Sequence, residues 1–315
     1  MIQLSIIIPY YNSGSTIKRL IDSIPQSDDY EIIIVDDHSD EGQFEQLNQL
    51  KRIYPKKRIY IYQNESNKKG AGAARNLGIK NARGKWCLFA DADDFFQKGF
   101  LEKVQNYFNS NYDIVFFKPT SMCEDTHQMS NRHQKYEDLV NDFIRDKNSH
   151  TELNLRSSYY VPWSKLYRLG FIEEYKIEFD EVPASNDVMF SVKTGFFAKS
   201  ITASDEVIYC VTRNKGSLTT NINEEIFDTR LEVSISRYKF LEKNLSVGDF
   251  KSLGLSGQGY LVMARKYGVK KIYQVIRILR MNQVRLFSSE ILNPITLFKR
   301  YIKLKSREKQ IKKYQ

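Results

Sequence analysis

The chain has few cysteines and no long apolar run. Its three cysteines, Cys87, Cys123 and Cys210, form no CxxC pair and have no partnering histidine cluster, which argues against a disulfide framework or a zinc site. No window approaches the roughly 18 apolar residues that a membrane-spanning helix needs. The first residues lack the basic region of a signal peptide. These absences predict reduced thiols and a cytoplasmic protein.

Two common nucleotide-binding motifs are also missing. No GxGxxG follows the first predicted strand, and the chain contains no GxxxxGK[ST]. A dinucleotide-binding fold and an NTPase phosphate loop are therefore not expected. The four histidines are scattered in polar surroundings, and we assign none of them a role.

The chain does have enough apolar residues for a large core. Its 315 residues are 41% apolar and 13% aromatic, which fits one large domain with an appendage, or two domains. The net charge of +10 is uneven, because residues 265–315 hold 15 Lys or Arg against two acids. The rest of the chain carries −3, so the basicity belongs to the C-terminal segment.

Short β-branched runs alternate with amphipathic stretches in the first 118 residues, which predicts a mostly parallel sheet flanked by helices. The predicted strands are residues 4–8, 31–35, 58–63, 86–90 and 113–117. The predicted helices are residues 16–24, 44–53, 71–82 and 95–108.

The second half of the chain has a different pattern. Residues 121–155 are polar, with one plausible helix at 136–144, and read as a flexible insertion. A helix is predicted from Asn186 to about Phe197, and a strand at 207–212. After about Asn221 the pattern is helical, with predicted helices at 226–243, 260–287 and 295–313.

Three carboxylates, Asp91, Asp93 and Asp94, directly follow the apolar run 86–90. A buried strand would deliver them to its C-terminal edge, where open α/β sheets bind ligands. Their mutual repulsion is costly unless a cation neutralises it, and Mg²⁺ or Mn²⁺ prefers such oxygen ligands, shared with substrate phosphates. The alternative is a turn in which Asp93 or Asp94 caps the helix predicted at 95–108.

Polar groups also follow the other predicted strands. Tyr11, after Pro9, can lie flat against a base, and Asp37 can accept from a ring N–H or a ribose hydroxyl. The alternative for Asp37 is a helix cap. The small residues from Gly70 onward let the backbone approach a diphosphate, with which Arg75 can pair.

Two ordered sets of motifs follow one another along the chain. The first set is SIIIPYYN at 5–12, VDDHS at 35–39, GAARNLG at 72–78 and DADD at 91–94, and it resembles the motifs of the family 2 glycosyltransferases. The second set is similar to the acceptor half of the bacterial polysaccharide members: WSKLY at 163–167, FI at 171–172, FDE at 179–181 and NDVMF at 186–190. Each motif alone is generic, but their order and spacing are specific.

The resemblance implies the GT-A fold, an α/β architecture with a mixed, mostly parallel sheet flanked by helices. The implied catalytic domain covers residues 1–220, with a nucleotide-sugar-binding half at 1–118 and an acceptor half at 119–220. Residues 221–315 would form a helical, basic extension. The implied reaction is an inverting transfer from a nucleotide-activated sugar, usually a UDP-sugar, to a hydroxyl of a growing capsule, lipopolysaccharide or related bacterial glycan.

The resemblance also implies roles for individual residues. The nucleotide-sugar would contact Pro9, Tyr11, Asp37, Gly70, Arg75, Asp91, Ala92 and Asp93. In the DXD motif at 91–93, Asp93 would hold Mn²⁺ or Mg²⁺ on the diphosphate, and Asp91 the ribose or the metal shell. Asp187 would be the general base that deprotonates the attacking hydroxyl. The alternative for Asp187 is a plain helix N-terminal charge.

Four further positions are candidates for acceptor or diphosphate contacts. Asn186 stands where the family usually has an acid beside the base. Trp163 could stack on an acceptor sugar or lie in the core, and Lys165 accompanies it. Arg213 begins a basic stretch that could meet the diphosphate or remain solvated.

The basic segment 297–305 interleaves apolar residues with lysine, which suits a helix on an anionic membrane. We therefore expect a peripheral protein at the inner face of the cell membrane, with a glycan acceptor that could be lipid-linked, no nucleic-acid partner, and a possible homo-oligomer. The alternative is a solvated helix. The rival functions are a non-catalytic glycan- or nucleotide-binding protein on the same fold, and a receiver-like phosphoacceptor domain suggested by Asp36 and Asp37 alone.

Overall fold

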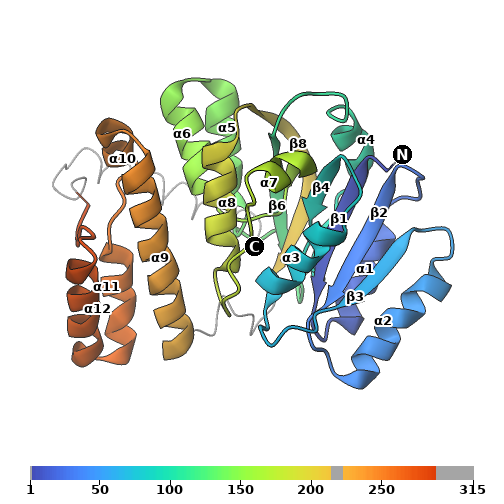
Figure 1. The fold of residues 1–315 in the computed structure, drawn as a ribbon, viewed down its shortest axis with the longest axis horizontal. Helices are drawn as coiled ribbons and strands as arrows, with labels where there is room; N and C mark the ends of the chain where they lie inside the picture. Colours follow the sequence, from blue (N-terminus) through green and yellow to red (C-terminus); the bar gives the residue numbers. More distant parts are fainter. Residues whose placement is uncertain (1, 214–222, 289–315) are drawn as a thin grey trace. The chain divides into compact units, whose positions relative to one another are not determined.

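The computed structural model describes residues 2–213 and 223–288 (Figure 1). The chain divides into two compact units, Met1–Ser217 and Leu218–Gln315. We call them the sheet unit and the helical unit. The boundary predicted between residues 220 and 221 falls outside the described residues and stays a prediction.

The sheet unit is built on one mixed sheet with the strand order β3-β2-β1-β4-β7-β6-β8-β5. Its first half is parallel and consists of β1 (Leu4–Tyr10), β2 (Tyr30–Asp36), β3 (Ile59–Gln63) and β4 (Trp86–Phe89). In the second half, β7 (Lys165–Arg168) runs antiparallel to β4 and to β6 (Ile114–Cys123). The long strand β8 (Ile201–Arg213) is parallel to β6, and β5 (Phe95–Phe96) pairs antiparallel with β8.

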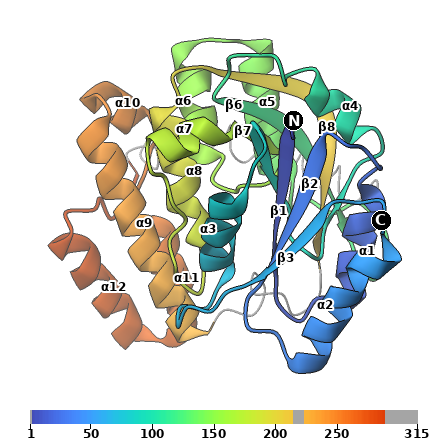
Figure 2. The ribbon, with the colours of Figure 1, turned by 45° about the vertical axis from the view of Figure 1, so that its right-hand side comes forward.

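Helices cover both faces of the parallel half (Figure 2). The helix α3 (Ala71–Asn81) packs on β1 and β2, where Ile33 and Val35 meet its Ala74. The alternate β2 residues, such as Ile34, belong to the main core together with residues of α1 (Gly14–Ser23) and α2 (Glu41–Ile53). Because side chains alternate along a strand, α1 and α2 lie on the face opposite α3. All seven residues of β2 are buried, as expected for a strand covered on both sides.

The region after β4 differs from its prediction. Residues 95–108 were expected to form one helix, but the first two form β5, and α4 spans Phe100–Gln105 behind Gly99. Phe95 and Phe96 pair with Cys210 and Tyr209 of β8. This partner strand lies more than 100 residues further along the chain, so no local pattern could indicate the pairing.

The segment 121–155 is ordered, and its prediction as a flexible insertion is wrong. It contains the end of β6, the whole of α5 (Gln134–Arg145) and most of α6 (Ser149–Ser158). The Asn148 side chain caps α6 by accepting hydrogen bonds from the backbone N–H groups of His150 and Thr151. The short helix α7 (Leu169–Glu174) and α8 (Asn186–Phe197) complete the unit.

The helical unit contains α9 (Glu224–Asn244), α10 (Val247–Ser252), α11 (Gln258–Ala264), the 3₁₀ turn η1 (Arg265–Tyr267) and α12 (Val269–Met281). The single helix expected at 260–287 is interrupted at Gly268, whose φ of 90° is left-handed. The helix expected at 295–313 and the basic segment 297–305 lie outside the described residues. None of the described helices has the length and apolar content to cross a membrane.

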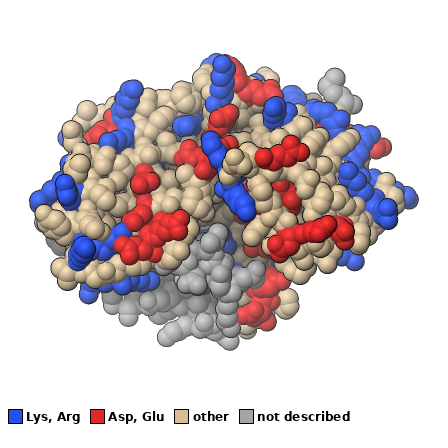
Figure 3. Space-filling model, turned by 60° about the horizontal axis from the view of Figure 1, so that its bottom comes forward, with Lys and Arg blue, Asp and Glu red and all other residues tan. Residues whose placement is uncertain are grey.

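On the face of the molecule drawn in Figure 3, acidic and basic side chains are interspersed.

Candidate active site

Strands β1, β2 and β4 end at the same edge of the sheet, and a polar cluster follows each of them. Tyr11 follows β1 and is 57% exposed, so its ring is free to meet a ligand, while Pro9 lies within the strand. The backbone N–H of Asp37, after β2, donates to the carbonyl of Tyr10 at 2.8 Å. The structure thus places the predicted base-binding residues side by side.

Asp37 holds the start of α3 and does not cap a helix. Its two carboxylate oxygens accept from the Asn64 amide at 2.8 Å and from the Gly70 backbone N–H at 2.6 Å. The helix α2 begins later, after Asp40. Gly70 has a φ of 131°, a conformation that other residues rarely adopt. Asp37 therefore joins the ends of two strands to the glycine-rich turn.

Asn64 is a site residue that the sequence reasoning missed. It directly follows β3, and its backbone N–H donates to the carbonyl of Asp36 at 2.8 Å. The strand-end rule that selected Asp37 and Asp91 applies equally to Asn64. A lone asparagine in a polar segment otherwise resembles an ordinary turn residue.

The acidic turn after β4 contains carboxylates in two different environments. Asp94 is 1% exposed and accepts from the backbone N–H of Thr212 at 2.7 Å and from the Tyr209 hydroxyl at 2.8 Å. Asp91 and Asp93 remain partly exposed. The alternative in which Asp93 or Asp94 caps a helix is wrong, because the next helix starts six residues beyond Asp94. Asp94 fastens the turn to β8, which leaves Asp91 and Asp93 for a ligand.

Burial and mutual repulsion both affect this turn. Burial raises the pKa of Asp93, the neighbouring Asp91 carboxylate raises it further, and Arg132 and Arg19 partly offset the effect. Burial likewise raises the pKa of Asp94 well above its usual range, with added repulsion from Asp93 and Asp91. A cation bound at Asp91 and Asp93 would relieve this repulsion. Ala92, between them, is 5% exposed.

Arg75 of α3 connects the two halves of the sheet unit. Its guanidinium donates to Asp91 at 2.6 Å and to the side-chain oxygen of Asn186 at 2.9 Å, and lies 5.3 Å from the centre of the Phe179 ring. The expectation that Arg75 pairs with a diphosphate does not match this arrangement, since its side chain is 6% exposed and held by protein partners. Asn186 acts here as a neutral acceptor for Arg75.

Asp187 is the second residue of α8 and is partly exposed in this site. Burial raises its pKa to about 6; Arg75 and Lys165 partly offset the shift, while Asp91 adds to it. A carboxylate that served only as a helix N-terminal charge would have a lowered pKa, so that alternative does not account for the shift. A carboxyl with this pKa is mostly ionised at neutral pH and still basic enough to accept a proton.

Two candidate acceptor residues belong to the core. Trp163 is 2% exposed and stacks on Tyr209 with 6.0 Å between ring centres, so the alternative of a core aromatic is correct. Lys165 is 1% exposed and donates to the carbonyl of Tyr159 at 2.9 Å, and burial lowers its pKa well below the usual range. Neither side chain is available to touch an acceptor. Arg213 is exposed at the end of β8, and the rest of its loop lies outside the described residues.

Asp91 and Asp93 fit part of a metal site. Within residues 2–213 and 223–288, no group of three or more His, Cys, Asp or Glu side chains is placed to hold an ion by itself. The two carboxylates would therefore need further oxygen ligands from a bound phosphate, which is how Mg²⁺ is commonly held. A cavity of about 690 Å³ lies beside α3, with Asn64 and Asn76 in its lining, but Asp91 and Asp93 are not among its lining residues.

Comparison with known proteins identifies the family of the chain. The family model for glycosyl transferase family 2 matches residues 5–175. The putative glycosyltransferase EpsH of Bacillus subtilis is 25% identical over 256 residues, which cover 79% of this chain and 72% of EpsH. A poly(ribitol-phosphate) beta-glucosyltransferase of Bacillus spizizenii is 30% identical over 222 residues, 66% of this chain and 32% of that protein. The chain thus spans about a third of the length of that larger relative.

The fold has solved counterparts. Residues 1–349 of Staphylococcus aureus TarS, crystallised with UDP-GlcNAc, superpose with a TM-score of 0.61 at 22% identity, covering 80% of this chain and 71% of that one. A mannosyltransferase of Pyrobaculum calidifontis, in complex with GDP-Man and Mn²⁺, superposes with a TM-score of 0.52 at 13% identity. The predicted GT-A fold and the predicted glycosyltransferase are confirmed. The chain belongs to glycosyl transferase family 2.

Proposed function

We propose that the protein transfers a sugar, with inversion, from a nucleotide-diphosphate donor to a hydroxyl of a bacterial surface glycan. The observation that carries the proposal is the placement of a raised-pKa carboxylate, Asp187, beside the acidic turn at Asp91, with Arg75 between them. The similarity to a poly(ribitol-phosphate) beta-glucosyltransferase supports a surface polymer as the acceptor, and the UDP-GlcNAc complex of TarS supports a UDP-sugar as the donor.

The donor would lie along the edge formed by β1, β2 and β4. Tyr11 would stack on the base, and Asp37 would accept a hydrogen bond from the nucleoside. The Asp37 side chain is held in place because its carboxylate already accepts hydrogen bonds from the Asn64 amide and the Gly70 backbone N–H. That rigidity lowers the entropic cost of ordering the site when the donor binds.

A Mn²⁺ or Mg²⁺ ion at Asp91 and Asp93 would neutralise the charge that builds up on the leaving diphosphate. Asp93 is the main ligand in this proposal, because one oxygen of Asp91 already accepts from Arg75. Asp94 stays outside the ligand set, since Thr212 and Tyr209 occupy its oxygens. Arg213 remains a candidate for the diphosphate.

Asp187 would take the proton from the acceptor hydroxyl as that oxygen attacks the anomeric carbon from the face opposite the diphosphate. The single displacement needs no covalent intermediate and inverts the anomeric centre. Arg75 would position Asp187 indirectly, because it holds Asn186, the preceding residue. The rival non-catalytic function gains no support from Asn186, whose neutral side chain has a clear partner here.

Thermal-shift titration with UDP, GDP and CDP, with Mn²⁺ or with EDTA, tests the donor site. We expect one nucleotide to raise the melting temperature in Mn²⁺ and not in EDTA. Asp93→Asn should remove this metal-dependent shift, whereas Asp205→Asn, at an exposed acid of β8, should retain it. A chain that responds to no nucleotide, or an Asp93→Asn variant with the full shift, would contradict the proposal.

A further inference from the structure

The helix α12 presents an unusual outer surface. Residues 265–288 contain seven Lys or Arg and no Asp or Glu. The exposed side chains of α12 include Val269, Lys270, Tyr273, Arg277, Arg280 and Met281, and we call these six residues the α12 face. These residues all lie within the described part of the chain, unlike the basic segment 297–305.

The six side chains lie on one side of the helix. At 100° per residue they fall within an arc of about 120°. Lys271, Val275 and Leu279 point the opposite way and are buried. Basic and apolar residues are mixed along the arc, and Tyr273 lies between Arg280 and Arg277. The packing of the helical unit accounts for the buried side but not for the α12 face.

Exposed apolar residues are concentrated in this unit. Among the described residues, eleven large hydrophobic side chains are exposed, and seven of them belong to residues 223–288. Val269 is 82% exposed, Met281 72% and Tyr273 68%. Single exposed apolar residues are common on protein surfaces, but a cluster that shares one helix face with cations marks an interaction surface.

We propose that the α12 face binds the surface of an anionic phospholipid membrane. Its basic residues would meet the lipid phosphates, while Val269, Tyr273 and Met281 would enter the headgroup region. Nucleic acid would attract the same charge, but aliphatic side chains such as Val269 and Met281 offer it neither stacking nor hydrogen bonds. The purpose of such binding, access to a lipid-linked acceptor, rests on the proposed function.

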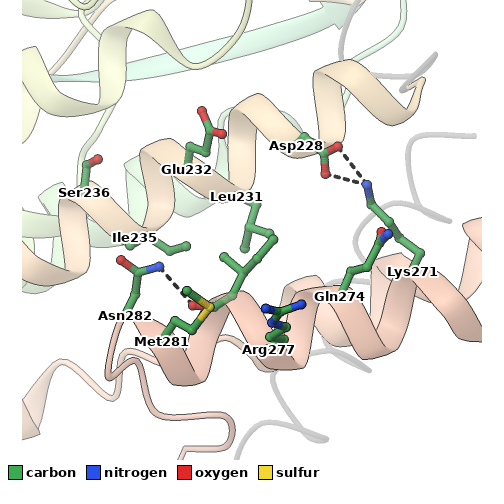
Figure 4. A pocket seen from close by; sticks show the side chains of 11 residues that line it. Asp228, Leu231, Glu232, Ile235, Ser236, Lys271, Gln274, Arg277, Met281 and Asn282 are labelled. Carbon is green, nitrogen blue, oxygen red and sulfur yellow. Dashed lines mark hydrogen bonds and ion pairs between the residues drawn. The ribbon is translucent and has the colours of Figure 1, made fainter.

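The groove next to the α12 face contains acidic as well as basic side chains. Figure 4 shows the groove of about 730 Å³ between α9 and α12, where Lys271 pairs with Asp228 at 2.7 Å. Glu232 also lines the groove, so two acids there face Lys271 and Arg277. Arg277 has no ion pair with another residue of the described chain. Arg277 and Met281 therefore belong both to the groove lining and to the α12 face, whereas Lys270 and Arg280 belong to the α12 face alone.

Co-sedimentation of the full chain with vesicles tests the proposal. We expect binding to vesicles of equal parts phosphatidylglycerol and phosphatidylcholine, and little to phosphatidylcholine alone. Changing Lys270, Arg277 and Arg280 together to Gln should lower the partition coefficient by about 100-fold, because each basic residue near an anionic surface contributes about fivefold. The matched control changes Lys51, Arg52 and Lys56 of the sheet unit to Gln. Its partition coefficient should fall by less than a tenth of the decrease expected for the α12 variant. Equal losses in both triple variants, or a loss under threefold in the α12 variant, would overturn the proposal.

Two further arms identify the partner and keep the test independent of catalysis. Tyr273→Ser with Met281→Ser should weaken vesicle binding about tenfold, because their apolar contribution is lost. Tighter binding to duplex DNA than to anionic vesicles would overturn the membrane proposal. The nucleotide-induced thermal shift should be unchanged in every α12 variant, which shows that they fold. Vesicle binding without a nucleotide response would contradict only the proposed function, and the reverse result only the membrane proposal.

Discussion

The sheet unit and the helical unit bury their apolar residues in different ways. In the sheet unit, β2 is buried along all seven residues because helices cover both faces of the sheet. In the helical unit, α12 buries one side of the helix and exposes Val269, Tyr273 and Met281 on the other. Because its core is packed on both faces of the sheet, the sheet unit holds the residues at its strand ends in fixed positions, close enough to hydrogen-bond one another. A reaction site requires such fixed positions. A one-sided helix leaves a surface for a partner.

The largest predicted effect comes from removing the proposed base, which lies in the sheet unit. Asp187→Asn should lower the rate of sugar transfer by about 1,000-fold, the usual contribution of a general base, while nucleotide binding is retained. Transfer assays with a UDP-sugar and thermal-shift titration would measure the two effects. A variant that keeps more than a tenth of the activity would exclude Asp187 as the base. The α12 triple variant is the control from the other unit and should keep full activity on a soluble acceptor.

Close packing around α3 predicts a large loss of stability from one methyl group. A Cβ at Gly72 would lie 2.1 Å from the carbonyl oxygen of Asp180, so Gly72→Ala must displace the start of α3. We expect a loss of about 3 kcal/mol in the free energy of unfolding, measured by urea denaturation. The matched variant Gly259→Ala, in α11 of the helical unit, meets nothing within 4 Å and should be neutral or slightly stabilising. Equal free energies of unfolding for the Gly72→Ala and Gly259→Ala variants would show that the start of α3 can shift without cost.

The pKa of Asp187, raised to about 6, sets the pH dependence of the sheet unit. A base must be ionised, so kcat/KM should fall about tenfold per pH unit below pH 6 and level off above it. The same shift affects stability: between about pH 4 and 6 the folded state holds the proton that the unfolded state has released. The contribution of Asp187 to the free energy of unfolding therefore falls as the pH rises through this window, and Asp187→Asn should remove that dependence. A profile that is flat down to pH 5 would contradict the assignment.

The smallest predicted effect belongs to the break before α12. Gly268 has a φ of 90°, and a Cβ there would meet nothing within 4 Å, so any effect of Gly268→Ala comes from backbone strain alone. We expect a loss of about 1 kcal/mol in the free energy of unfolding, with unchanged transfer activity. Hydrogen exchange would locate the loss. Weakened protection in α3, instead of α12, would show that the stability of the sheet unit depends on the helical unit.

Local patterns predicted the elements that have a clear signal in their own sequence. The β-branched runs indicated β1 and β2, and the small residues after Gly70 indicated α3. The errors arose where distant partners decide the structure. Phe95 and Phe96 form a strand only because Cys210 and Tyr209 lie beside them. The helix α6 was missed because its apolar pattern is weak, with Leu155 as its fully buried apolar residue, and its clearest signal is the Asn148 cap.

The sequence indicated the residue types of the candidate site but not the partners of each side chain. The strand-end rule placed Tyr11, Asp37 and Asp91 at one edge, and the structure places them there. Sequence alone could not show that the Arg75 side chain is held between Asp91 and Asn186, since these residues come from separate segments. It also could not separate the buried Lys165 from an acceptor contact, because burial depends on rings of β6 and β7 that surround its ammonium group.

The fastening of Asp94 to β8 affects how mutational data on this turn should be interpreted. An alanine scan of residues 91–94 would report Asp94 as essential, because its loss would leave the Thr212 backbone N–H and the Tyr209 hydroxyl without their acceptor. An activity assay alone would then assign three acids to the reaction, whereas in the structure only Asp91 and Asp93 are left for a ligand. Only a readout of folding, taken beside the assay, distinguishes a carboxylate that supports the turn from those that face the donor.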